Sequence, residues 1–242
     1  VSLRPFPDNA FRVRASYKDI FRVPTFTDLY YLRMGNTNLK PEETSQYNVG
    51  VTWSSSCGDW LRHFSISADG YYNTVKDKIV ALPTMYVWKM MNMGEVDIKG
   101  VDVNLSTQFR LPLRMSLLLA STYSFQYAVD VTDPEAKNYK DQIPYTPRHS
   151  GTVSVTLENP WVNVSYILTA VGDRYALPQN IDRNRIDSYI EQSISINRDF
   201  RFRYFGLRLQ GELLNLANVN YDVIQYYPMP GRSWRLSICL SY

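Results

Sequence analysis

Few side chains in this sequence are of the types that perform catalysis, and their spacing does not assemble a catalytic set. The 2 histidines, His63 and His149, have no nucleophile motif such as GxSxG beside them. Ser150 follows His149 directly, which is too local an arrangement to indicate a catalytic pair, so we interpret His149 as structural. Phosphate-binding motifs of the GxGxxG or GxxxxGK[ST] type do not occur. The sequence therefore predicts a protein that is not an enzyme.

An acidic segment, DVTDPEAKNYKD, carries oxygen ligands of the kind that Ca²⁺ prefers. Its carboxylates are Asp130, Asp133, Glu135 and Asp141. The segment lacks the spacing and the glycine of an EF-hand loop, and a solvated turn around Pro134 is the simpler interpretation. Calcium in this loop stays open as an alternative, and the sequence predicts no other metal or cofactor.

Aromatic and arginine side chains in the long polar connections are better candidates for chemistry, because flat or amphipathic ligands are held by aromatic faces and a few placed polar groups. The candidates for ligand binding are Tyr31, Arg33, Tyr86, Trp88, Arg174 and Tyr226. A methionine-rich loop adjoins Trp88 and offers either an adaptable contact surface or packing against a neighbouring loop. Its methionines are Met85, Met90, Met91 and Met93.

The elements that position these residues are strands, as the last segment shows most clearly. From Trp234 to Tyr242, large apolar residues alternate strictly with Arg235, Ser237, Cys239 and Ser241. Side chains on a strand have a period of two, so one face of this strand is apolar and the other polar. An aromatic residue stands at each end of the apolar face, about 25 Å apart at about 3.3 Å per residue. That spacing is typical of the lipid-facing band of an outer-membrane barrel.

The same alternation recurs along the chain and predicts about ten strands. They begin near residues 11, 47, 64, 101, 115, 153, 162, 186, 205 and 234. The connections alternate between short turns and long polar loops, as in barrels with short periplasmic turns and longer extracellular loops. One long loop is expected from the end of the third strand through Trp88 and Met93. No apolar run reaches the roughly 18 residues of a membrane-spanning helix.

The polar face of these strands is predicted to line a wet interior, because its charges would be costly in lipid. It carries Arg12, Arg14, Arg208, Arg235, Asp69, Asp102 and Glu212. A mean hydropathy of -0.30 fits a chain with one polar and one apolar face.

The net charge of +3 comes from basic residues that are scattered rather than clustered, so no nucleic-acid partner is expected. Tyr30 and Tyr227 are interpreted as girdle residues at the membrane interface, with ligand contact as the alternative.

A segment after the first strand, FRVPTFTDLYYLRMGNTNLKPEETSQYNVG, carries a longer motif. It resembles the barrel of TonB-dependent outer-membrane receptors in its FRxP, DLY, GN, LKPE and YxxG pieces. MGEVDIKGVDV, IPYTPRHSG, ELLNLANVNY and the terminal PGRSWRLSICLSY agree with the same family. The resemblance covers essentially the whole chain.

The resemblance implies an all-β fold, an antiparallel transmembrane β-barrel of about 22 strands with a plugged lumen. With about ten strands and neither plug nor partner-binding box, residues 1–242 are expected to be one unit, the C-terminal section of such a barrel, which transports nothing by itself. The expected location is the outer membrane of a Gram-negative bacterium, crossed many times, with long loops extracellular and the C-terminus periplasmic.

The function that the resemblance implies is energised uptake of a scarce nutrient, a corrinoid or a ferric siderophore. The implied partners are outer-membrane lipid, the TonB complex through an N-terminal region, the small nutrient and a surface lipoprotein. The alternatives are a passive outer-membrane pore or surface-binding barrel, and, less favoured, a glycan importer.

Overall fold

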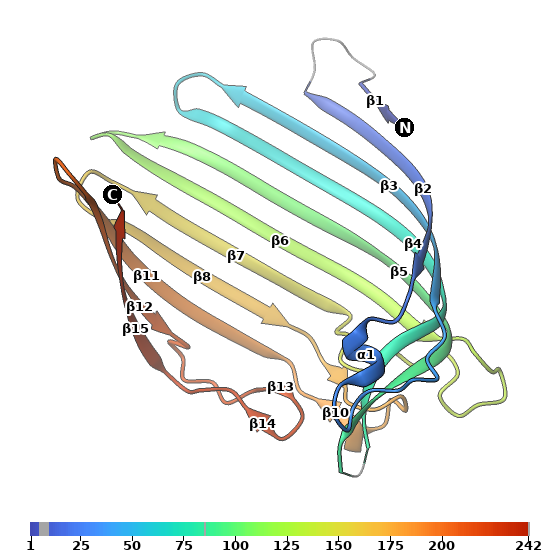
Figure 1. Ribbon diagram of the computed structural model, residues 1–242. Helices are drawn as coiled ribbons and strands as arrows, with labels where there is room; N and C mark the ends of the chain where they lie inside the picture. Colours follow the sequence, from blue (N-terminus) through green and yellow to red (C-terminus); the bar gives the residue numbers. More distant parts are fainter. Residues whose placement is uncertain (5–9, 85, 242) are drawn as a thin grey trace.

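One large antiparallel sheet makes up the body of the molecule (Figure 1). The computed structural model describes residues 1–4, 10–84 and 86–241. The sheet runs in chain order apart from short loop strands. Its members are β1 (Ser2–Leu3), β2 (Phe11–Arg22), β3 (Glu42–Cys57), β4 (Leu61–Pro83), β5 (Trp88–Leu111), β6 (Met115–Asp130), β7 (His149–Glu158), β8 (Asn163–Val171), β11 (Tyr189–Arg201), β12 (Gly206–Leu214) and β15 (Ser233–Ser241). The ten predicted strands are thus present, and the two-residue β1 adds an eleventh that the sequence pattern did not indicate.

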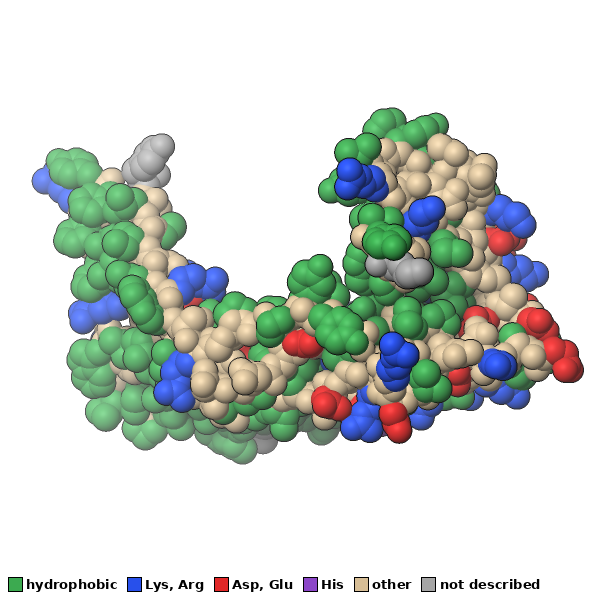
Figure 2. All heavy atoms as spheres, turned by 90° about the horizontal axis from the view of Figure 1, so that it is seen from below, with side chains coloured by type: hydrophobic (Ala, Val, Ile, Leu, Met, Phe, Trp, Pro, Cys, Tyr) green, Lys and Arg blue, Asp and Glu red, His purple; other side chains and the backbone are tan. Residues whose placement is uncertain are grey.

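The sheet curves into an open trough whose two faces follow the period-two pattern. Cross-strand partners share a face, and the register joins apolar to apolar positions, as in the row Val13, Val51, Ala68, Val103 and Tyr123. Figure 2 shows hydrophobic side chains gathered on the outside of one arm and along the base of the U-shaped wall, and a hollow inside the U. Many outer residues are exposed, among them Leu236, Ile238 and Leu240, each at about two-thirds of its surface. This face requires an apolar surrounding medium.

The inner face is polar, as the alternation predicts, and several of its charges pair with one another across strands. Arg14 donates to Asp69 at 2.8 Å although β3 lies between their strands. The pair spans β3 at Gly50, where a Cβ atom would lie 1.9 Å from the Asp69 Oδ1 atom. Glycine at this position therefore leaves the space that the ion pair occupies. Asp102, the cross-strand neighbour of Asp69, accepts a hydrogen bond from the Ser124 hydroxyl.

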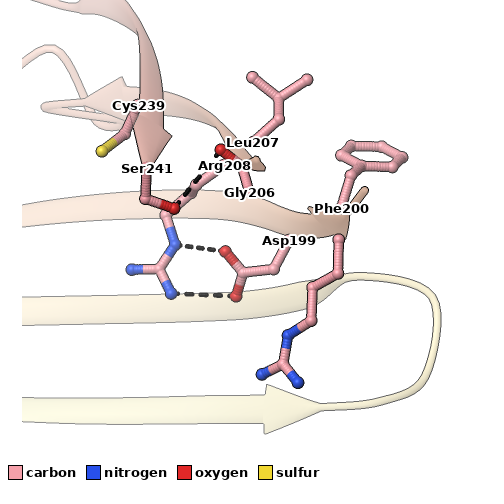
Figure 3. A pocket seen from close by; sticks show the side chains of 8 residues that line it. Asp199, Phe200, Gly206, Leu207, Arg208, Cys239 and Ser241 are labelled. Carbon is pink, nitrogen blue, oxygen red and sulfur yellow. Dashed lines mark hydrogen bonds and ion pairs between the residues drawn. The ribbon is translucent and has the colours of Figure 1, made fainter. Parts of the chain in front are cut away.

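Two further inward ion pairs lie near the C-terminus. Arg208 on β12 donates through Nε and Nη2 to the carboxylate of Asp199 on β11, at 2.6 and 2.9 Å (Figure 3). Arg235 on β15 pairs with Glu212 on β12. The expected inward orientation of these arginines is confirmed, and Asp199 is a partner that was not among the predicted inward charges.

The two ends of the sheet differ, because one end carries short turns and the other carries the long loops. The short turns join β3 to β4, β5 to β6, β7 to β8 and β11 to β12. The β5–β6 turn places Leu113 and Arg114 at φ of 60° and 58°, a left-handed conformation typical of tight hairpins. The alternation of short and long connections is confirmed at every position but one.

The exception is the predicted long loop through Trp88 and Met93, which is wrong. β4 and β5 instead continue as a hairpin of 23 and 24 residues closed by a short turn. Beyond Lys76 and Val96 neither strand pairs with its outer neighbour, so the hairpin projects past the sheet. Residues Lys78 to Pro83 of β4 pair continuously with Met93 to Trp88 of β5, so the backbone hydrogen bonds of this segment are made within the hairpin. Met85 lies outside the described residues.

Short elements fold over the loop end. They are α1 (Phe26–Tyr30), β9 (Arg174–Tyr175), the 3₁₀ turn η1 (Asp182–Asn184), β10 (Arg185–Ile186), β13 (Asp222–Ile224) and β14 (Tyr227–Pro228). Across the described ranges, no helix combines the length and the apolar character needed to cross a membrane.

Aromatic residues mark the edges of the apolar outer band. At the loop end a cross-strand row reads Tyr17, Tyr47, Tyr72, Lys99 and Tyr127. Elsewhere at that end, Trp234 stands 79% exposed at the start of β15. Tyr242, the predicted second aromatic of this strand, lies outside the described residues. The row agrees with an aromatic girdle at a membrane interface.

Candidate ligand-binding site

The inner face changes from polar to apolar at the loop end of the sheet. Val75, Val96, Ile98 and Ala128 occupy inward positions there and are nearly or fully buried. Ile143 packs against them from the loop that follows β6, and its backbone N–H donates to the Ala128 carbonyl at 3.0 Å. Burial of these side chains draws the loop inward over the end of the trough.

A pocket of about 430 Å³ opens beside this cluster. Segments distant in sequence form its walls, and its lining residues are Val80, Ala81, Leu82, Trp88, Ile143, Pro144, Tyr145, Arg174, Val223 and Ile224. The projecting hairpin and the last long loop each supply part of the lining. Most of the lining is apolar or aromatic, with one charged side chain.

That charged side chain, Arg174, is only 3% exposed. Its guanidinium lies 5.5 Å from the ring centre of Tyr189, and its Nη2 donates to the carbonyls of Asp222 and Val223. Its Nη1 is buried and has no hydrogen-bond partner among the described residues. A buried donor without an acceptor costs free energy, so this nitrogen favours an oxygen acceptor supplied from outside the chain.

Two aromatic pairs lie at the pocket, one in its lining and one beside the guanidinium. The rings of Trp88 and Tyr145 lie 5.6 Å apart at 39°, and those of Tyr189 and Tyr221 stack at 4.1 Å. Burial raises the pKa of the Tyr145 hydroxyl, partly offset by the Gln225 backbone N–H and by the charge of Arg174. Burial also raises the pKa of the Tyr221 hydroxyl. Both phenols therefore stay neutral at physiological pH.

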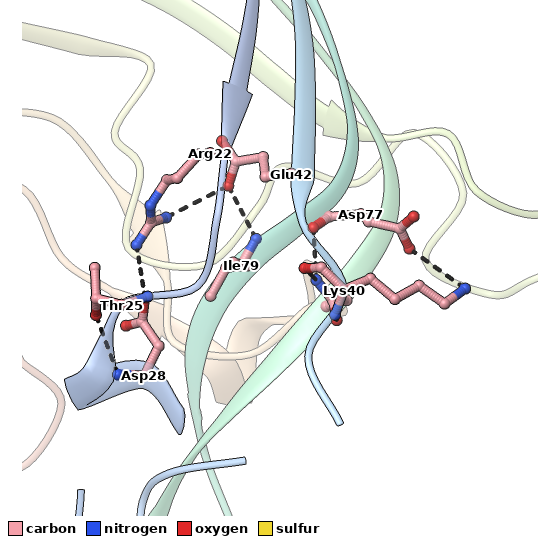
Figure 4. Close-up of polar contacts among 8 residues, drawn as sticks. Arg22, Thr25, Asp28, Lys40, Glu42, Asp77 and Ile79 are labelled. Carbon is pink, nitrogen blue, oxygen red and sulfur yellow. Dashed lines mark hydrogen bonds and ion pairs between the residues drawn. The ribbon is translucent and has the colours of Figure 1, made fainter. Parts of the chain in front are cut away.

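A set of polar contacts braces the loop that leads from β2 to β3 (Figure 4). Thr25 caps α1: its hydroxyl accepts the Asp28 N–H, and the Asp28 carboxylate accepts the Thr25 N–H at 2.9 Å. Arg22 donates to Asp28 at 3.1 Å and to Glu42 at 3.5 Å. Glu42 also accepts the Ile79 N–H at 3.1 Å, which ties this loop to the projecting hairpin. We call these four residues and Ile79 the loop clasp.

Two of the six predicted ligand residues, Trp88 and Arg174, meet in the pocket. The other four do not line it. Tyr31 and Arg33 are exposed beyond the end of α1, Tyr86 is 90% exposed at the hairpin turn, and Tyr226 is 80% exposed between β13 and β14. Their role in ligand contact stays a prediction.

The remaining aromatic and methionine predictions concern loop elements. Tyr30 lies on α1 with its ring 4.9 Å from that of Phe26, and Tyr227 lies on β14, so neither belongs to the aromatic row of the sheet. Met93 is buried in the inner apolar cluster, which supports the packing interpretation of the methionine-rich segment for that residue.

Sequence reasoning missed Tyr145, Tyr189 and Tyr221. Tyr145 lies within the IPYTPRHSG piece and adopts a φ of 57°, a left-handed backbone conformation that is unusual for an aromatic residue. Tyr145 and Tyr221 lie in two separate loops and Tyr189 begins β11, so only the tertiary fold brings these rings near Arg174, and no local sequence pattern predicts it.

The acidic segment folds as a hydrogen-bonded turn. The Asp130 carboxylate accepts the Thr132 N–H at 2.9 Å, the Thr132 hydroxyl at 2.5 Å and the Asn138 amide at 2.9 Å. Within the described ranges, no group of three or more His, Cys, Asp or Glu side chains could hold a metal ion. His149, interpreted from the sequence as structural, shares a 2.8 Å hydrogen bond between its Nδ1 and the Tyr123 hydroxyl.

Comparisons with known proteins agree with this architecture. The family model "TonB dependent receptor-like, beta-barrel" matches residues 1–216. The vitamin B12 transporter BtuB of Photobacterium profundum is 27% identical over 92% of this chain and 34% of its own length. BtuB of Vibrio vulnificus is 24% identical over 88% of this chain and 32% of its own length. The chain therefore spans about a third of the length of these relatives.

Solved structures share the fold at low sequence identity. The copper transporter OprC superimposes with a TM-score of 0.70 at 16% identity, covering 98% of this chain and 38% of its own. The unliganded ferric citrate transporter FecA gives 0.71 at 11% identity, covering 97% of this chain and 36% of its own. These relatives are transporters and receptors rather than enzymes, in agreement with the predicted lack of a catalytic set. With nearly nine-tenths of its length matched by the family model, the chain belongs to the TonB-dependent receptor-like β-barrel family.

Proposed function

We propose that this chain forms the ligand-contacting part of an outer-membrane importer for a scarce nutrient. Family membership places the chain in the bacterial outer membrane, and the apolar outer face suits lipid. The observation that carries the proposal is the buried, unpaired Nη1 atom of Arg174 in an otherwise apolar pocket at the loop end.

The chemistry of the pocket suits one part of an amphipathic ligand. Trp88 and Tyr145 provide aromatic faces, while Arg174 offers a donor to an anionic or carbonyl oxygen. A volume of about 430 Å³ accommodates a substituent of a large nutrient rather than the whole molecule. The rest of the ligand lies across the hollow of the trough, toward the exposed Tyr31, Arg33, Tyr86 and Tyr226.

A corrinoid is the first candidate ligand. The relatives matched in sequence are vitamin B12 transporters, and a corrinoid combines a flat ring with peripheral carbonyl and phosphate oxygens that a guanidinium binds. A ferric siderophore is the second candidate, supported by structural neighbours such as the ferric citrate transporter. An anionic iron chelate would use the same arginine.

Import would be energised through TonB, which acts on a plug and an N-terminal box in the intact protein. In the orientation that we propose for the barrel, the long loops face the outside of the cell and the short turns face the periplasm. A surface lipoprotein that covers the loops is a further proposed partner. Support for this arrangement is the family membership and the polar, ion-paired inner wall that would surround a plug.

Binding to the intact receptor tests the ligand site. Purified full-length receptor is titrated with cyanocobalamin, and in parallel with ferric citrate and ferric enterobactin, by isothermal calorimetry. Arg174→Gln should weaken binding of the preferred ligand roughly 10- to 100-fold, because a hydrogen bond to a charged group is lost. Arg62→Gln, which removes an exposed arginine at the short-turn end of β4, far along the strand from the pocket, is the matched control and should change the affinity much less.

Arg174 also supports the backbone of β13, so a second variant separates contact from support. Trp88→Ala leaves the Asp222 and Val223 contacts in place and should still weaken binding. Unchanged affinity in both variants would contradict the assignment of the pocket. Binding of none of the three ligands would contradict the choice of nutrient.

Uptake by intact cells tests the energised mechanism against a passive pore. Uptake of the bound ligand should stop when TonB is deleted or the proton gradient is collapsed. A passive pore would instead admit small solutes into liposomes that contain only the purified receptor, at a rate independent of any energy source.

A further inference from the structure

A pair of cationic side chains, Lys99 and Arg148, lies on the lipid-facing side of the sheet, opposite the polar inner face. Lys99 occupies the outer row between Tyr72 and Tyr127, at the loop end of the apolar band. Its ammonium group lies 5.1 Å from the centre of the Tyr127 ring. Arg148 places its guanidinium 5.2 Å from the centre of the same ring. Two cations thus converge on one aromatic residue of the girdle.

A hydrogen bond to a buried glutamine fixes the guanidinium of Arg148. Its Nε donates to the Oε1 atom of Gln142 at 2.7 Å, and Gln142 is only 2% exposed. The Gln142 amide in turn donates to the Thr146 carbonyl. Since the buried amide fixes one edge of the guanidinium, its remaining donors have little orientation left to lose on binding.

Neither cation has a carboxylate partner within the described part of the chain. The ion pairs there join other residues, and both Lys99 and Arg148 are exposed. Beside Arg148 a hollow of about 400 Å³ is lined by His149, Asp173, Tyr175 and Ser188 among others. Asp173, the acid in this hollow, already accepts the Ser188 N–H at 3.2 Å.

The position of the pair along the wall determines what it meets. Its row is the aromatic girdle, which in a membrane lies at the depth of the lipid headgroups. A lysine and an arginine at that depth meet anionic headgroup oxygens, and a phosphate satisfies a guanidinium and an ammonium together. From this geometry we propose that Lys99 and Arg148, whose cationic groups both lie near the ring of Tyr127, form a binding site for the phosphate of a lipid headgroup. The lipid belongs to the leaflet on the loop side of the membrane.

Two cations at one ring distinguish this site from a single exposed cation that is attracted to the membrane surface. Arg198 provides the contrast, because it is also an exposed cation near an aromatic ring, 4.8 Å from the centre of Phe200. It pairs across strands with the outward Leu209 and lies near the short-turn end of the sheet. Arg198 has no second cation at its ring among the described residues, so it lacks the paired arrangement.

Native mass spectrometry of the full-length receptor tests the proposal. The receptor in detergent is titrated with bis-phosphorylated lipid A and, separately, with the same lipid after removal of its phosphates. The wild-type receptor should retain the phosphorylated lipid in preference. The double variant Lys99→Gln/Arg148→Gln should retain on the order of tenfold less of it, because two charge-assisted contacts are lost.

Arg198→Gln is the matched control and should retain the lipid as the wild type does. The charge-conserving Lys99→Arg variant should also retain it, which separates a charge contact from a packing defect. Heat-modifiable mobility on gels verifies that each variant is folded.

Three results would overturn the proposal. The first is equal retention of the phosphorylated and dephosphorylated lipids, and the second is an equal loss in Arg198→Gln and in the double variant. The third is displacement of the lipid by an equal concentration of inorganic phosphate, which would identify a site for the free anion.

Discussion

The wall of the sheet and its loop end are built by different rules. In the wall, each side chain has neighbours set by the register of adjacent strands, as in the row that joins Val13 to Tyr123. At the loop end, the pocket joins the β4–β5 hairpin, through residues 80–82 and 88, to residues 143–145, 174 and 223–224, and no strand register relates these segments to one another. The wall therefore tolerates exchange of one residue for another of the same polarity, whereas the loop end depends on individual contacts.

The largest expected effect concerns the polarity of the wall. Val103 faces outward near the middle of the apolar band, between Ala68 and Tyr123 in register. Val103→Arg should lower the free energy of unfolding in lipid vesicles by about 2–4 kcal/mol, because a charge is placed in the hydrocarbon layer. Asn104→Arg, one residue further along and on the inner face, is the control. If guanidinium titration showed the same loss of unfolding free energy in both full-length variants, the distinction between the outer and inner faces would be refuted.

A smaller effect is expected from one contact in the loop clasp. Asp28→Ala removes the acceptor of the Thr25 N–H and of Arg22 and should destabilise this loop locally by roughly 1–2 kcal/mol. Hydrogen exchange of residues 23–36 in the full-length receptor measures the change. Exchange in the wall, for instance in β6, should stay as in the wild type, and a global increase would contradict a local role.

Acid should open the clasp in the same way. The pKa of Asp28 is lowered chiefly because its carboxylate accepts the Thr25 N–H; burial opposes this shift, while the Thr25 hydroxyl and the Arg22 charge add to it. A lowered folded-state pKa contributes stability that is fully present above the ordinary aspartate value, near pH 4, and is lost as the pH falls further. Exchange protection of residues 23–36 should therefore decline below about pH 4. An Asp28→Asn receptor should lack this component of the decline.

The smallest effect concerns the ion pair across Gly50. Gly50→Ala places a methyl group where the Asp69 carboxylate lies and should displace it from Arg14. Both charged side chains are at least a third exposed, so the expected cost is within about 1 kcal/mol. Gly211→Ala, whose added methyl meets no atom within 4 Å, is the matched control for the backbone effect of alanine. Equal denaturation midpoints for the two variants would show that the pair contributes nothing measurable.

The same contrast explains what could be predicted from the sequence. Period-two alternation was sufficient for the ten long strands and for the inward orientation of Arg14, Arg208 and Arg235, because strand geometry alone assigns faces. The projecting hairpin was missed, since Lys78 to Met93 mixes polar and apolar residues without regular alternation. Trp88 and Arg174 were proposed from residue type, whereas Tyr145 depends on a left-handed backbone and on contacts between loops.

The hairpin of β4 and β5 also offers a place for an insertion. Its closing turn lies beyond the last residues that pair with β3 and β6, so added residues there would leave the register of the wall unchanged. Tyr86 in that turn is 90% exposed and makes none of the contacts that line the pocket. A peptide epitope introduced beside Tyr86 would label intact cells and report directly on which side of the membrane the hairpin stands.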